Sequence, residues 1–68
     1  MKYNRIKDVS EDTKRSQKWL ADQLDVSVVT VSNWYRNQKQ PSLESIFRIS
    51  DVLQCKPSEL IHNERKGN

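Results

Sequence analysis

The sequence predicts an all-α fold, a compact domain of five short helices, and three observations support this fold class. Apolar residues recur at helical spacing, serines stand where helix N-caps are expected, and no stretch alternates polar and apolar residues as a strand does. The composition, 34% hydrophobic and 31% charged, suits short helices with one apolar stripe each better than a sheet. We expect a single domain over residues 1–68, with a helical core over about 4–61 and a polar tail over 62–68.

The first half of the chain predicts three helices. The first covers about 4–14 and places three side chains at helical spacing: Tyr3, Ile6 and Val9. The second follows an N-cap at Ser16, and its apolar face holds Leu20, Ala21 and Leu24. Ser27 caps the third, which begins at Val28 and directs Val31 and Trp34 to one side.

The second half predicts an ordered loop and two more helices. The loop covers 36–40 and ends at Pro41, because a residue before proline avoids helix. Ser42 caps the fourth helix, whose inner face holds Leu43, Ile46, Ile49, Ser50 and Leu53. Pro57 fits the first turn of a short fifth helix carrying Leu60 and Ile61; Lys56 is a poor cap there, and Ser58 is the alternative cap.

Charge and composition limit the classes of function. The net charge of +3 is concentrated in the first 18 residues and favours a polyanionic partner. Cys55 is the only cysteine, so we expect no disulfide or cysteine metal site, and a reducing cytoplasm is the natural setting. We expect no metal, cofactor or enzymatic activity, because His62 lies in the polar tail and no catalytic set converges. No apolar run predicts a membrane span or a signal peptide.

One motif, from Gln17 to Arg36, carries the functional prediction. Its small or apolar residues are Leu20, Ala21, Leu24, Val26, Val31 and Trp34. Two helices that cross steeply need a small side chain at their closest approach, which Ala21 supplies. They also need a buried residue in the turn between them, which Val26 supplies. This spacing predicts a helix-turn-helix at helices two and three.

The motif and its surroundings resemble the lambda-repressor-like, or Cro/XRE-type, helix-turn-helix family. The residues that carry the resemblance are Ser16-Gln17, Leu20-Ala21, Val26-Ser27, Thr30-Val31-Ser32-Asn33-Trp34 and Pro41-Ser42-Leu43-Glu44. It implies a bacterial or phage transcriptional regulator, most often a repressor, that binds double-stranded operator DNA as a homodimer.

The sequence departs from the family at four places. Asp25 occupies a turn position that is usually Gly, and Asp tolerates a left-handed conformation better than most residues. Arg15 stands where an apolar residue is usual, so its stem is expected along the core edge. Ser10 and Tyr35 replace an Arg–Glu ion pair of many relatives, and Tyr35 is expected to fill that space.

The resemblance places the third helix in the major groove, and helical geometry gives the side chains that face the bases. These are Val28, Val29, Ser32 and Asn33. The valines can read only shape and the thymine methyl group, whereas Asn33 can bind adenine N6 and N7. The alternative, that both adjacent valines belong to the core, conflicts with Val31 and Trp34 already occupying that face.

Contacts to the DNA backbone are expected from two places. Gln17 begins the second helix, whose free N–H groups favour a phosphate. The others lie in or after the third helix: Thr30, Arg36, Asn37, Lys39 and Gln40. Polarity at each of these positions is equally consistent with a solvated loop, and Trp19 can pack on helix one or lie on the DNA backbone.

Two other classes of protein compete with a DNA-binding regulator. The same fold can serve as a protein-interaction module, as in antitoxins that also bind DNA, and the sequence leaves this open. A membrane-surface peptide is disfavoured, because no helix has a basic amphipathic face. For the homodimer, the region 54–61 is the expected pairing surface, with Leu60 or Ile61 exposed.

Overall fold

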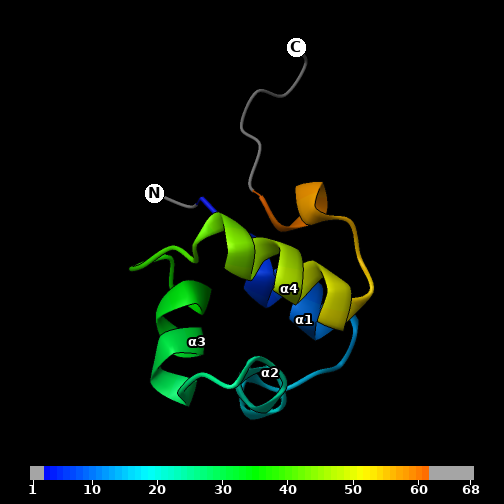
Figure 1. Ribbon diagram of the computed structural model, residues 1–68. Coiled ribbons are helices and arrows are strands. Elements are labelled where there is room, and N and C mark those ends of the chain that lie inside the picture. The colour runs from blue at the N-terminus through cyan, green and yellow to red at the C-terminus, as the bar shows by residue number, and fades with distance from the viewer. Residues whose placement is uncertain (1–2, 62–68) are drawn as a thin grey trace.

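The computed structural model describes residues 3–61 as four α-helices followed by one 3-10 turn (Figure 1). The elements are α1 (Ile6–Asp12), α2 (Gln17–Leu24), α3 (Val28–Tyr35), α4 (Leu43–Leu53) and η1 (Pro57–Leu60). The predicted all-α class is confirmed. The expected fifth helix is instead a single 3-10 turn that begins, as predicted, at Pro57. No helix within residues 3–61 is long and apolar enough to cross a membrane.

Serine caps fix the starts of the three central helices, as the sequence predicts. Ser16 Oγ accepts a hydrogen bond from the Trp19 N–H, and Ser27 and Ser42 do the same for the third residue after each of them. The C-terminal ends of α2 and α4 are closed by residues in the left-handed conformation. Asp25 and Gln54 both have φ of 59°, so the expected tolerance of Asp25 for this conformation is confirmed.

The first helix is shorter than the predicted range 4–14. Asn4 Oδ1 accepts a hydrogen bond from the Ile6 N–H at 3.0 Å, and helix begins only after this local bond. The residues before it pair with the end of η1 and the residue that follows it: Asn4 forms an isolated antiparallel bridge with Ile61, and the Arg5 N–H donates to Leu60 O at 2.8 Å. Tyr3, expected on the helical stripe, therefore lies outside the helix and is 57% exposed.

The core lies where the helices meet, α2 contacting α3 and α4 while α1 contacts α3 and η1. Its buried apolar residues are Ile6, Val9, Leu20, Ala21, Leu24, Val31, Trp34, Ile46, Ile49, Leu53 and Leu60. The predicted inner face of α4 is correct from Ile46 onward but wrong for Leu43, which is 69% exposed because it precedes the part of α4 that meets the core. Leu60 is buried, and Ile61 is exposed.

Candidate nucleic-acid interface

Helices α2 and α3 form the predicted helix-turn-helix. Ala21 is buried on α2, the helix that packs against α3, and the Val26 N–H donates to Ala21 O at 3.0 Å, which closes the turn at Asp25. Val26 is half-buried and packs against the core. A larger side chain than Ala21 would push the two helices apart, so this small residue sets how α3 is held.

The outward face of α3 carries two exposed valines at its N-terminal end. Val28 and Val29 are 43% and 68% exposed, whereas Val31 on the opposite face is fully buried. The alternative in which both valines belong to the core is therefore wrong. Val28 and Val29 are therefore accessible to another molecule at the start of α3. Ser32 and Asn33 lie further along α3 and are half-buried.

Asn33 is held by a neighbouring cation one turn away. Arg36 Nη2 donates to Asn33 Oδ1 at 2.9 Å. An amide oxygen has two lone pairs, so this bond leaves one acceptor position, and within residues 3–61 both amide hydrogens of Asn33 are free for another partner. Arg36, expected at the DNA backbone, thus also restrains the side chain that is expected to read adenine.

The other expected backbone contacts differ in their availability. Gln17 is the first residue of α2, and Lys39 is exposed in the loop after α3. Thr30 is half-buried, and its hydroxyl lies 3.0 Å from Ser27 Oγ at the N-terminus of α3. Lys39 is thus open to a phosphate, Gln17 is half-buried at the start of α2, and the Thr30 hydroxyl also belongs to the helix cap.

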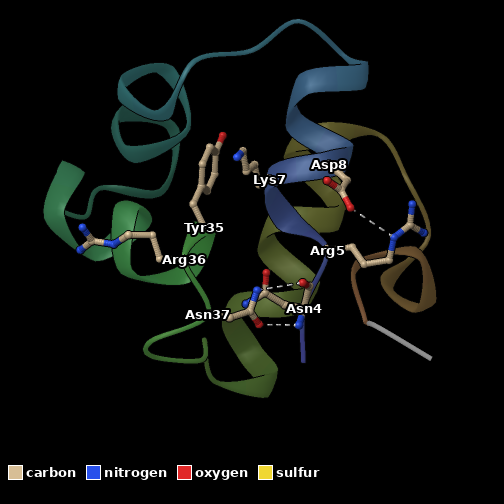
Figure 2. A pocket seen from close by; sticks show the side chains of 7 residues that line it. All are labelled: Asn4, Arg5, Lys7, Asp8, Tyr35, Arg36 and Asn37. Atoms are coloured by element: carbon tan, nitrogen blue, oxygen red, sulfur yellow. Dashed lines mark hydrogen bonds and ion pairs between the residues drawn. The ribbon is translucent and has the colours of Figure 1, made fainter. Parts of the chain in front are cut away.

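Asn37 and Gln40 bind within the protein. Asn37 Oδ1 accepts hydrogen bonds from the backbone N–H groups of Tyr3 (2.7 Å) and Asn4 (2.9 Å), as Figure 2 shows in part. Asn4 Nδ2 donates to Gln40 Oε1 at 2.8 Å and to Trp34 O at 3.1 Å. The sequence predictions missed Asn4, which is 3% exposed. A lone polar residue before a helix gives little warning of such a role.

Tyr35 fills the space of the missing ion pair, as expected, and extends from α3 toward α1 (Figure 2). The Tyr35 and Ser10 hydroxyls are both buried, and neither meets the geometry of a hydrogen bond with any group in residues 3–61. Burial raises the pKa of Tyr35; the neighbouring Ser10 hydroxyl opposes this rise, and the Glu11 carboxylate adds to it.

Arg15 and Trp19 form a pair beside α2. The Arg15 guanidinium lies 4.2 Å from the centre of the Trp19 ring, a cation–π distance, and Trp19 packs partly against the core. Arg15 is exposed, and its head group covers Trp19, which itself packs partly against the core.

Within residues 3–61 no group of three or more His, Cys, Asp or Glu side chains is placed to hold a metal ion. Cys55 is half-buried against the core, as expected for a structural cysteine, and burial followed by the nearby Glu59 carboxylate raises the pKa of its thiol. His62 lies outside the described residues.

Comparison with known proteins agrees with this arrangement. The helix-turn-helix family matches residues 8–60. Over 60 residues the chain is 35% identical to the HTH-type transcriptional regulator DicA of Escherichia coli K12 and 32% identical to repressor protein C2 of Salmonella phage P22. Each match covers 88% of this chain but only 44% and 28% of those two proteins, so the chain spans less than half of their length.

A solved structure gives the same result. The crystal structure of a candidate DNA-binding protein from Bacteroides fragilis superposes with a TM-score of 0.88 at 39% identity, covering 91% of this chain and all of that one. The residues that carried the resemblance in the sequence lie within the family match. The chain belongs to the lambda-repressor-like, XRE/Cro-type helix-turn-helix family, a family of DNA-binding regulators rather than enzymes.

Proposed function

We propose that this chain is a sequence-specific DNA-binding regulator, of the repressor type, that reads an operator by placing α3 in the major groove. The observation that carries the proposal is the exposure of Val28 and Val29 at the N-terminal end of α3, on the helix face opposite the core. Two adjacent exposed valines lower the solubility of a protein. In a helix that lies in the major groove, such side chains can contact the methyl groups of thymine.

Polar groups around the valines supply the rest of the proposed interface. Asn33 retains the donors and the acceptor position that a bidentate contact to adenine needs, while Arg36 restrains it. Gln17 and Lys39 flank α3 and would hold phosphates, and the net charge of +3 adds non-specific attraction. We therefore expect an operator half-site that contains A·T base pairs. The regulator would act in the cytoplasm on double-stranded DNA.

Selection of bound sites from random double-stranded DNA tests this proposal. The expected result is an enriched motif of two A·T-containing half-sites about one helical turn apart, since each α3 covers only a few base pairs. Selection should be repeated with Val28→Ala/Val29→Ala, which is expected to change the preferred bases opposite these residues while leaving the helical content unchanged. Recovery of no motif from the wild-type protein, or an unchanged motif from the double variant, would reject α3 as the reading element.

A further inference from the structure

Arg36 and Asn33 form a polar pair at the C-terminal end of α3. Arg36 is the residue that ends the helix, and Asn33 lies three positions before it, so the two side chains share one side of the helix. Arg36 Nη2 donates to Asn33 Oδ1 at 2.9 Å. Within residues 3–61 the Arg36 guanidinium forms no ion pair, so the Asn33 amide oxygen is the acceptor that holds it. A cation at this end of a helix is also favoured by the helix dipole.

The surroundings of Arg36 keep its guanidinium on the Asn33 side. A hollow of about 270 Å³ lies between the start of α1 and the end of α3, and Arg36 lines it together with two further cations, Arg5 and Lys7. Asp8 also lines the hollow, and its Oδ2 lies 3.9 Å from Nε of Arg5. Figure 2 shows the Arg36 side chain extending away from Lys7. Repulsion between like charges therefore opposes a swing of Arg36 into the hollow and favours its bond to Asn33.

The chemistry of the two groups determines which way the Asn33 amide faces. A guanidinium only donates hydrogen bonds, and in a side-chain amide only the oxygen accepts them. Turning the Asn33 amide over would place its amino group against the Arg36 guanidinium, where both groups are donors and no bond can form. Arg36 therefore keeps Asn33 Oδ1 on its own side and directs Asn33 Nδ2 away from itself. The bond is charge-assisted, which makes it stronger than a bond between two neutral groups.

We propose that Arg36 is a positioning residue for base reading, which acts through Asn33 and excludes cytosine as the base that Asn33 faces. This inference rests on the proposed function, in which α3 lies in the major groove. Because Oδ1 is engaged by Arg36, Asn33 meets a base first through its Nδ2 donors, which need an acceptor on the base edge. Adenine supplies that acceptor at N7, and its N6 amino group can donate to the second lone pair of Asn33 Oδ1. Cytosine presents only the N4 amino donor there, so donors would face donors.

A first measurement, on the free protein, tests whether Arg36 holds the Asn33 amide. NMR relaxation of the Asn33 side-chain amide is compared between the wild type, Arg36→Met and Lys39→Met. Both variants remove one positive charge from an exposed side chain at or after the end of α3, but only Arg36→Met removes the bond to Asn33. We expect the order parameter of the Asn33 amide to fall in Arg36→Met and to keep the wild-type value in Lys39→Met. Circular dichroism checks that each variant is folded.

A second measurement, on DNA, tests the exclusion of cytosine. Competition anisotropy compares operators that carry each base in turn at the position where Asn33→Ala relaxes the preference. The wild type should bind the adenine operator at least about fivefold more tightly than the cytosine operator, the lower end of what one bidentate base contact discriminates. Arg36→Met should lower this ratio toward that of Asn33→Ala, and the double variant Asn33→Ala/Arg36→Met should lower it no further. Lys39→Met should weaken binding to all these operators by the same factor and leave the ratio unchanged.

The outcomes separate this inference from the proposed function. A ratio of adenine to cytosine affinity that falls in Arg36→Met, together with a lower order parameter of the Asn33 amide, supports Arg36 as the positioning residue. Equal weakening of Arg36→Met on all operators, with the ratio unchanged, would show that Arg36 acts only as a cation and would overturn the inference. An Asn33 amide that is equally ordered in Arg36→Met would overturn it as well. Failure of the wild type to bind DNA or to prefer any base would instead reject the proposed function, and the inference with it.

Discussion

Asn4 and Asn37 join the N-terminal segment to the loop after α3 through reciprocal hydrogen bonds. Asn37 Oδ1 accepts from the Asn4 N–H at 2.9 Å, and Asn37 Nδ2 donates to Asn4 O at 3.2 Å (Figure 2). Asn4 Nδ2 continues to Trp34 O at the end of α3. This link holds the loop that carries Lys39 against the body of the protein.

Replacing Asn37 with glycine should therefore destabilise the protein although it relieves the backbone. Asn37 has φ of 57°, where glycine is the most tolerant residue, but the variant Asn37→Gly loses the bonds to Tyr3 and Asn4. We expect a loss of about 1–3 kcal/mol in the free energy of unfolding, measured by urea denaturation.

Lys14→Gly is the matched control for this substitution. Lys14 is exposed and has φ of 60°, and its side chain makes no hydrogen bond or ion pair within residues 3–61. Because glycine adopts the left-handed conformation without strain, Lys14→Gly should raise the free energy of unfolding by up to about 1 kcal/mol. If both variants gain stability, the bonds of Asn37 contribute little.

The sequence predicted the local features of this fold well. The caps at Ser16, Ser27 and Ser42 and the crossing at Ala21 depend on residues within a few positions of each other, so spacing alone revealed them. Asn37 was expected at the DNA backbone, and its bonds within the protein were missed because its partner, Asn4, is 33 residues away in the sequence.

The end of the domain was predicted less well for a similar reason. Leu43 fits the apolar stripe of α4, but which turn of a helix meets the core depends on neighbours that periodicity does not show. Likewise, the bridge between Asn4 and Ile61 joins residues far apart in the sequence. It depends on tertiary packing, which local sequence patterns do not show.

Ala21→Leu tests the packing of the helix-turn-helix. Ala21 is 1% exposed between α2 and α3, so three added carbon atoms have no free space to occupy. Overpacking of this kind should lower the free energy of unfolding by about 1–3 kcal/mol. Gln23→Leu, an exposed position on the same helix, is the control and should change stability little. An unchanged melting temperature for Ala21→Leu would place this residue outside the helix crossing.

The buried hydroxyl of Tyr35 should make stability fall at alkaline pH. Burial raises the pKa of Tyr35 above 10.0, so the folded state favours the neutral phenol. The contribution is complete below pH 10 and is lost as pH rises through the folded-state pKa. Burial also raises the pKa of the Cys55 thiol above its ordinary value of 9.0, so Cys55 lowers stability at alkaline pH as well. Both proteins in this comparison therefore carry Cys55→Ala, which removes the contribution of the thiol.

In that background, Tyr35→Phe should unfold with a weaker pH dependence between about pH 9 and 11 than the parent. Near neutral pH it should be as stable as the parent or slightly more so, because it removes a buried hydroxyl that meets the geometry of no hydrogen bond within residues 3–61. Parallel stability curves for the two proteins across this range would show that Tyr35 ionises equally well folded and unfolded.

Asn33→Ala tests base reading by α3. We expect a loss of about 1–3 kcal/mol in binding to the selected operator and a relaxed preference at one base pair. Arg36→Ala is the companion variant, because it removes the bond to Asn33 Oδ1 and a cation together. Fluorescence anisotropy with operator and random DNA separates the loss of base reading, which affects operator DNA alone, from the loss of a cation, which weakens binding to both DNAs. Equal losses on both DNAs for Asn33→Ala would mean that this side chain reads no base.

Lys39 provides the test of how the loop after α3 meets DNA. It is exposed, and its side chain has no hydrogen bond or ion pair within residues 3–61, so it is free to bind a phosphate. Each phosphate contact releases about one counterion, so Lys39→Ala should weaken specific and random DNA alike. The slope of log affinity against log salt should fall by about one per subunit, with the preferred sequence unchanged.

Lys56→Ala is the control for this measurement, because Lys56 lies beside Asp51 and Glu59 in a hollow that α3 does not line. It removes the same net charge at a site remote from the proposed interface, where screening over a Debye length of about 10 Å at 0.1 M salt makes its effect small. Affinities are measured from low to moderate salt for both variants. Because the two proteins have equal net charge, a difference in slope reports where the charge lies rather than how much there is. Matching slopes would exclude the loop after α3 from the DNA backbone, even for a protein that still binds operator DNA.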